Sequence, residues 1–175
     1  MGLARSWALS AVSVVLAALL QRHANAVRQQ LREWCYEAAA KQGARRQARP
    51  GETCFVPLLL WVLSRWPGTP LALALDATTW GTRFTGRAIR VGDRGCALPV
   101  AWTIRLATQP APWRRPWRRL GRLLRPAIPP GFTVIVLADR GLYAPWMFRR
   151  LVRLGWPPFW RRNGGGTFRP APQAP

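Results

Sequence analysis

Apolar residues follow two different periods along this chain. Residues 7–40 predict a helical N-terminal segment: an apolar run at 8–20 is followed, from Val27 to Ala38, by apolar residues at the i, i+4, i+7 and i+8 spacing of one helix face. A basic stretch rich in turn residues follows at 41–51 and indicates a linker. Residues 55–66 predict a further helix that ends at the Pro-Gly pair 67–68, and we expect its Trp61 surface to lie in the core.

A strand-like pattern replaces the helical one after residue 70. Residues 71–75 form a short apolar run typical of a buried strand. Residues 83–91 and 96–106 predict two more strands, joined as a hairpin by the turn at 92–95. Residues 132–137 are apolar and rich in β-branched side chains, which predicts a central strand buried on both faces.

Helices and a last short strand complete the order of elements. Residues 113–125 form an amphipathic pattern, 144–154 have helical character, and 158–162 are compatible with a strand. This order predicts an α/β fold: a partial RNase H-like mixed sheet with flanking helices, whose first and fourth strands lie side by side. An N-terminal helical segment precedes it.

The same pattern divides the chain into three parts. We expect a helical segment with a basic linker over 1–69 and an incomplete RNase H-like core over 70–163. The remaining residues, 164–175, lack the side chains needed to build a core, so we expect a disordered tail.

The charge balance points to a polyanionic partner. The chain has 27 Lys+Arg against 6 Asp+Glu, a formal net charge of +21, which favours nucleic acid. An Arg-, Ala-, Pro- and Gly-rich composition also fits a GC-rich coding region, so charge alone leaves the partner open. Cys35, Cys54 and Cys96 are widely spaced and His23 is the only histidine, which argues against a structural zinc site or a disulfide framework.

The N-terminus has the outline of a secretory signal. Arg5 precedes the apolar run 8–20, and the triplet at 24–26 resembles a cleavage site. The run is too short to span a bilayer, and the helical spacing continues beyond it through Val27 and Leu31. We therefore expect a cytoplasmic, nucleoid-associated bacterial protein with no membrane partner, and a secreted basic protein stays as an alternative.

Two carboxylates follow the predicted central strands. Asp76 ends the run 71–75 and Asp139 ends the run 132–137. If these strands are parallel neighbours, both side chains emerge at one edge of the sheet, where they could share Mg²⁺ or Mn²⁺ and serve phosphodiester chemistry. The alternative is that each aspartate only caps a helix or forms a turn.

Four collinear segments carry a resemblance to a known family. They read QLREW at 30–34, LALDAT at 73–78, RGCALPVAW at 94–102 and LADRGLY at 137–143. With these segments the chain resembles DDE transposases of the bacterial insertion-sequence-four type over most of its length. The resemblance implies that Asp76 and Asp139 are the first and second catalytic, metal-binding carboxylates, and that Mg²⁺ or Mn²⁺ is the cofactor.

The third carboxylate of that family has no counterpart here. The family carries a downstream Glu, whereas no Asp or Glu follows Asp139 in this chain. We therefore expect a transposase truncated before the catalytic Glu, without strand transfer on its own, and a non-catalytic DNA-binding or dimerising remnant stays as an alternative. Among the other acids, Asp93 fits turn chemistry, Glu33 and Glu37 fit surface pairs, and Glu52 has no identifiable partner in the sequence.

Arginines near the amphipathic helix and near Asp139 are the candidate DNA contacts, because phosphate contacts from arginine dominate non-specific binding. The expected partner is DNA, as insertion-sequence ends and target, with a homo-oligomer left open. The candidate DNA-binding residues are Arg114, Arg115, Arg118, Arg122, Arg140, Arg149, Arg150, Arg161 and Arg162.

Overall fold

The computed structural model describes residues 8–34, 36–41, 50–108 and 113–161. The chain forms two compact units, which meet in sequence between Pro50 and Gly51. The second unit therefore begins earlier than the expected core, which we placed at 70–163. Arg162 and the expected tail at 164–175 lie outside the described residues.

The N-terminal unit contains two helices within the segment that the sequence predicts to be helical. They are α1 (Leu9–Leu20) and α2 (Ala24–Trp34), followed by the short 3-10 helix η1 (Ala38–Ala40). The break falls at Gln21, whose φ of 51° is left-handed, and the next amide, of Arg22, donates to Ala17 O. The helical character expected over 7–40 is confirmed for these helices, and the left-handed cap ends α1 without glycine or proline. No helix among the described residues is long and apolar enough to cross a bilayer.

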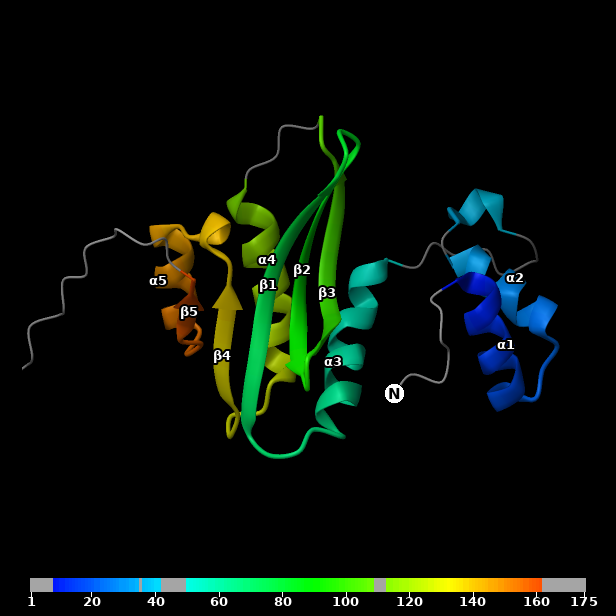
Figure 1. The fold of residues 1–175 in the computed structure, drawn as a ribbon, viewed down its shortest axis with the longest axis horizontal. Coiled ribbons are helices and arrows are strands. Elements are labelled where there is room, and N and C mark those ends of the chain that lie inside the picture. Colours follow the sequence, from blue (N-terminus) through cyan, green and yellow to red (C-terminus); the bar gives the residue numbers. More distant parts are fainter. Residues whose placement is uncertain (1–7, 35, 42–49, 109–112, 162–175) are drawn as a thin grey trace, which may run out of the picture. The chain divides into compact units, whose positions relative to one another are not determined.

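A five-stranded mixed sheet organises the second unit (Figure 1). The strands are β1 (Pro70–Trp80), β2 (Phe84–Asp93), β3 (Cys96–Leu106), β4 (Thr133–Ala138) and β5 (Pro158–Trp160). Their order is β3-β2-β1-β4-β5; β1, β2 and β3 are antiparallel, whereas β4 runs parallel to both β1 and β5. The expected neighbouring of the first and fourth strands is confirmed.

The β2–β3 hairpin also forms as predicted. Its turn uses left-handed backbone at Arg94 and Gly95, with φ of 44° and 82°, the geometry that a two-residue hairpin turn requires. A register shift between Ile89 and Arg90 bends the edge strand β3.

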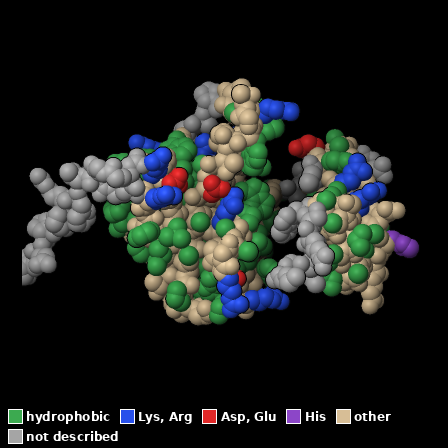
Figure 2. Space-filling model, viewed as in Figure 1, with side chains coloured by type: hydrophobic (Ala, Val, Ile, Leu, Met, Phe, Trp, Pro, Cys, Tyr) green, Lys and Arg blue, Asp and Glu red, His purple; other side chains and the backbone are tan. Residues whose placement is uncertain are grey.

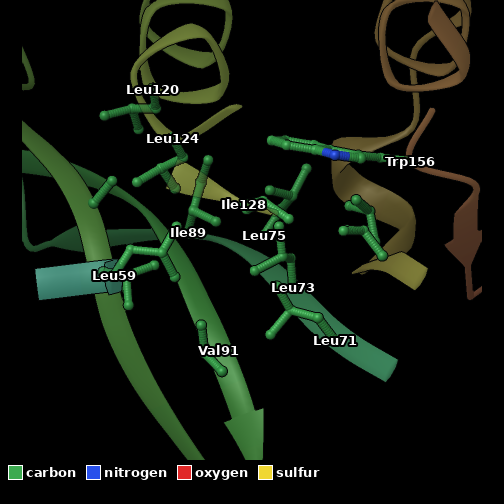
Figure 3. Packing of buried hydrophobic residues seen from close by; sticks show 14 of the residues in the cluster. Leu59, Leu71, Leu73, Leu75, Ile89, Val91, Leu120, Leu124, Ile128 and Trp156 are labelled. Atoms are coloured by element: carbon green, nitrogen blue, oxygen red, sulfur yellow. The ribbon is translucent and has the colours of Figure 1, made fainter. Parts of the chain in front are cut away.

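Helices cover one face of this sheet. They are α3 (Phe55–Leu63), α4 (Arg114–Leu124) and α5 (Pro145–Arg153), with the 3-10 helices η2 (Gly51–Cys54), η3 (Arg125–Ala127) and η4 (Arg140–Leu142). Figure 3 shows side chains of α4 meeting those of β1 and β2 in this layer, where Leu59 and Leu120 are almost fully buried. The core prediction fails for Trp61, which is 56% exposed.

The second face of the sheet is largely open, which corrects the prediction for β4. Its residues alternate between buried and exposed: Val134 and Val136 are buried, whereas Ile135 and Leu137 are 41% and 39% exposed. Phe159, beside Leu137 on β5, is 69% exposed. An apolar run does not reveal how many faces are covered, and here the helices cover one.

Candidate functional site

Asp76 lies on the open face, inside a strand rather than at its end. Along β1, Leu71, Leu73 and Leu75 point into the core, so by alternation Asp76 projects from the other face. The strand continues to Trp80 because its far half still pairs with β2. The prediction that Asp76 ends its strand is therefore wrong, but pairing with β4 does stop at Leu75.

Asp76 already has two polar contacts on this face. Arg90 Nη2 donates to Asp76 Oδ2 at 2.7 Å in an ion pair, and Thr78 Oγ1 donates to the same oxygen at 3.2 Å. Arg90 reaches it from β2, where it pairs across strands with Ala74. These contacts hold one carboxylate oxygen, and the side chain as a whole remains 40% exposed.

Asp139 follows the last residue of β4 and caps a short helix. Its Oδ1 accepts a hydrogen bond of 2.7 Å from Arg140 N at the start of η4. This is the capping role that the alternative explanation gives to such an aspartate. The residue is exposed, and it lies beside β5, because Arg161 N donates to Ala138 O.

The two aspartates directly follow paired residues of neighbouring strands. The last parallel pair of β1 and β4 is Leu75 with Ala138, so Asp76 and Asp139 are the next residues of neighbouring strands. Such strands lie about 4.8 Å apart. Leu75 and Ala138 are both buried on the helix side, so both carboxylates emerge from the open side. Figure 2 shows two groups of acidic atoms, with basic atoms beside them, on the surface over this part of the sheet.

A shallow hollow of about 210 Å³ adjoins Asp76 on the β2–β3 side. Arg90, Trp80 and Trp102 are among the residues that line it. Trp102 is 38% exposed and its ring packs against Phe55 at 4.8 Å between centroids. The hollow gives a planar or extended ligand room beside the carboxylate.

The donor set fits a divalent cation only in part. The hydrogen bonds described above use Asp76 Oδ2 and Asp139 Oδ1, so Asp76 Oδ1 and Asp139 Oδ2 could each offer one oxygen to Mg²⁺ or Mn²⁺. Within the described ranges no group of three or more Asp, Glu, His or Cys residues is placed to hold a metal ion. Two monodentate oxygens leave most of the coordination to water or phosphate, and the Arg90 charge opposes a cation beside Asp76.

The other acids named from the sequence have contacts of their own. Glu52 forms an ion pair with Arg119 of α4, a partner that the sequence did not reveal. Glu33 accepts a hydrogen bond from Gln29 on α2, and Asp93 sits at the β2–β3 turn as expected.

The candidate DNA-binding arginines fall into two separate groups. Arg114, Arg115, Arg118 and Arg122 are exposed on α4, in the layer of helices, and so lie across the sheet from the carboxylates. The second group lies around β4, β5 and α5. It contains the exposed Arg140, Arg149 and Arg161, together with the half-buried Arg150.

Three basic residues of interest were missed by sequence reasoning. Arg90 contacts Asp76, Arg105 lines a groove beside α4, and Arg87 is 8% exposed. Burial, with a smaller effect of nearby Arg105, lowers the pKa of Arg87 below its ordinary value. The only available signal was the presence of these arginines inside the predicted strands 83–91 and 96–106.

A scan of protein-family models and searches of curated proteins and of solved structures each found no match to this chain.

Proposed function

We propose that this chain carries two of the three metal-binding carboxylates of a DDE transposase of the insertion-sequence-four type, Asp76 and Asp139. The proposal rests on the register of β1 and β4. Asp76 and Asp139 directly follow the paired residues Leu75 and Ala138, which brings both aspartates to one place on the open face. The central position of β1 and β4 agrees with the RNase H-like core that the resemblance implies. The proposed setting is DNA transposition in the bacterial cytoplasm.

Each residue has a separate task in this proposal. Asp76 and Asp139 each hold a divalent ion through one oxygen, and such an ion, when bound, activates a nucleophilic oxygen and stabilises the leaving oxyanion. Arg140 follows Asp139 in the sequence, and Arg161 follows β5 and donates its amide to Ala138 O. Both arginines attract the DNA backbone to the site. Arg90 orients the Asp76 carboxylate through its ion pair.

The proposed site is incomplete without a third carboxylate. No acid follows Asp139 in the sequence, and in the second unit Glu52 pairs with Arg119 and Asp93 lies at the β2–β3 turn. A carboxylate on a helix laid over the open face would reach both aspartates, and the exposed Leu137 and Phe159 leave that face available for packing. We therefore expect weak metal binding and no strand transfer by this chain alone.

Metal binding tests the proposal without requiring catalysis. Binding of Mn²⁺ to the full chain is measured by electron paramagnetic resonance for Asp76→Asn, Asp139→Asn and the control Asp93→Asn. All three remove one negative charge, and asparagine retains the ability to cap η4 at position 139. Weaker binding in the first two alone is expected. Unchanged binding in Asp76→Asn and Asp139→Asn would refute a shared metal site.

One observation favours a second function, a DNA-binding remnant without chemistry. The Arg90 guanidinium already neutralises Asp76, and Asp139 already caps η4, so both carboxylates have structural roles without metal. Under this alternative Mn²⁺ binds all three variants equally, while the chain still binds DNA. The same titration therefore separates the two functions.

A further inference from the structure

A basic groove runs between α4 and the edge strand β3. Its volume is about 580 Å³, and five arginines and one glutamate contribute to its walls. The charged lining residues are Glu52, Arg105, Arg115, Arg118, Arg119 and Arg122. Glu52 is engaged by Arg119, so the groove retains a large excess of positive charge.

The groove lies on the side of the sheet that faces away from the carboxylates. The buried face of α4, with Trp117, Leu120 and Leu124, packs on the helix-covered side, to which Leu73 and Leu75 point. Asp76 projects from the other side. A ligand in this groove is therefore separate from one bound at Asp76 and Asp139.

The arginines of α4 form a row. Positions 115, 118, 119 and 122 have the i, i+3, i+4, i+7 spacing that places side chains on one side of a helix. Seven residues of helix extend about 10.5 Å, at about 1.5 Å a residue. Phosphates of one DNA strand advance about 3.4 Å each along the duplex axis, so the row spans about three of them. A row of this length suits a linear polyanion better than a single small anion.

Positive charge in this region lacks the usual compensation. The first turn of α4 has no acidic residue and no side-chain cap, although Arg114 and Arg115 sit at the positive end of the helix dipole. Arg87 lies next to groove-lining Thr103 across β2 and β3. Its buried Nε and Nη1 have no hydrogen-bond partner among the described residues, and its guanidinium lies 5.4 Å from the Trp113 ring centroid. An anion in the groove would offset the uncompensated charge at the start of α4, whereas Arg87 itself lines the hollow beside Asp76 rather than the groove.

We infer that the α4–β3 groove binds the phosphate backbone of double-stranded DNA, as a second nucleic-acid surface independent of the carboxylate pair. A basic amphipathic helix can also lie on an acidic membrane by inserting its apolar face. In α4 that face is already buried in the core through Trp117, Leu120 and Leu124, so insertion would require unpacking the unit. The choice of DNA among polyanions rests on the proposed function; the anion site itself does not.

Fluorescence anisotropy of a labelled 20-base-pair duplex with the full chain tests the inference. The groove variant is Arg115→Gln/Arg118→Gln/Arg122→Gln, and the matched control is Arg65→Gln/Arg94→Gln/Arg125→Gln, three exposed arginines outside the groove. Each lost phosphate contact lowers the slope of log affinity against log salt by about 0.9. The groove variant is expected to lose at least tenfold in affinity and about 2.7 in that slope, which is three times 0.9. The control is expected to lose less than threefold.

A second pair of variants tests the groove by gain of binding. Glu52→Gln and Glu37→Gln each remove one negative charge, but only Glu52 lines the groove. Glu52→Gln is expected to tighten duplex binding severalfold and Glu37→Gln to leave it unchanged. Circular dichroism melting confirms that every variant is folded before binding is compared. Equal losses in the two arginine triples, or equal gains in the two glutamate variants, would overturn the inference.

Two further measurements identify the ligand and keep this inference apart from the proposed function. Vesicles with acidic phospholipids are expected not to compete with the duplex; effective competition would reject the DNA assignment in favour of a lipid surface. Asp76→Asn is expected to retain full duplex affinity, and a loss like that of the groove triple would place binding at the carboxylates instead. Failure of Mn²⁺ to distinguish the aspartate variants would reject the proposed metal site and leave the groove result intact.

Discussion

Arg90 Nη2 lies 2.7 Å from Asp76 Oδ2, and the two residues belong to neighbouring antiparallel strands without being directly opposite. Asp76 is opposite Ala88, and Arg90 is opposite Ala74, so the ion pair is diagonal. The contact orients the carboxylate, and its positive charge would oppose a metal ion at the proposed site. Removal of the Arg90 side chain should therefore raise metal affinity and lower the order of the Asp76 carboxylate.

Replacing Arg90 with Gln is expected to raise Mn²⁺ affinity by about three- to tenfold, because a cation beside the ligand oxygen is removed. Isothermal titration calorimetry measures the change. Arg83→Gln removes an exposed arginine beside β2 that contacts Phe84 instead, and should leave the affinity unchanged. Equal effects of the two variants would show that only net charge matters.

The open face predicts an asymmetry between leucines of neighbouring strands. Leu73 on β1 is fully buried, so Leu73→Ala should lower the free energy of unfolding by about 3 kcal/mol. Leu137 on β4 is 39% exposed, and Leu137→Ala should cost about 1 kcal/mol or less. Urea denaturation measures both. Similar costs would mean that the second face is covered in solution.

The capping role of Asp139 is separable from its charge. Asp139→Ala removes the acceptor for Arg140 N and should cost about 1 kcal/mol of stability, whereas Asp139→Asn should cost much less. Thermal melting of both variants gives the comparison. Indistinguishable melting temperatures for Asp139→Ala and the unmodified chain would show that this cap adds no stability.

Trp80 lies over a glycine of the neighbouring strand. A Cβ built on Gly86 would come within 2.5 Å of the Trp80 ring, so Gly86→Ala must displace that ring. Trp80→Ala should cost about 1 kcal/mol in the unmodified chain and clearly less in the Gly86→Ala background, since the contact is then already lost. Denaturant unfolding of the four proteins measures this coupling, and additive costs would contradict it.

Arg87 carries a charge that the fold buries without a carboxylate. Arg87→Met keeps an apolar stem of similar length and removes the buried charge, so the free energy of unfolding should rise by about 1 kcal/mol in the absence of DNA. Chemical denaturation with and without duplex tests this. A loss of stability in the free chain would show that the contact with Trp113 outweighs the cost of burial.

The periodicity of apolar residues was sufficient to predict the strands and the α/β class. It did not predict which faces of the strands are covered. The hairpin was readable because turn residues separate two strand-like runs at 92–95. The exposure of Leu137 was not, since an apolar run has the same sequence whether a helix covers it or not. The left-handed Gln21 had no preceding signal, because neither glycine nor proline marks it.

The aspartates of the candidate site could be predicted from the sequence, whereas Arg90 and Arg105 could not. Asp76 and Asp139 stand out because the chain has only 6 acidic residues and two of them follow apolar runs. Their matching register required the parallel pairing of β1 and β4 to be known. Arg90 contacts Asp76 across strands and Arg105 lines the groove beside α4, and both placements depend on a strand register that one sequence does not display.

The uneven pairing of β1 has a mechanical consequence. As far as Leu75 the strand has a neighbour on each side, and from Asp76 to Trp80 only β2 remains. The chains of β1 and β4 thus separate directly after Leu75 and Ala138, and Asp76 and Asp139 are the first residues beyond the last pair. Any twist of β1–β2–β3 relative to β4 would therefore change the distance between the two carboxylates.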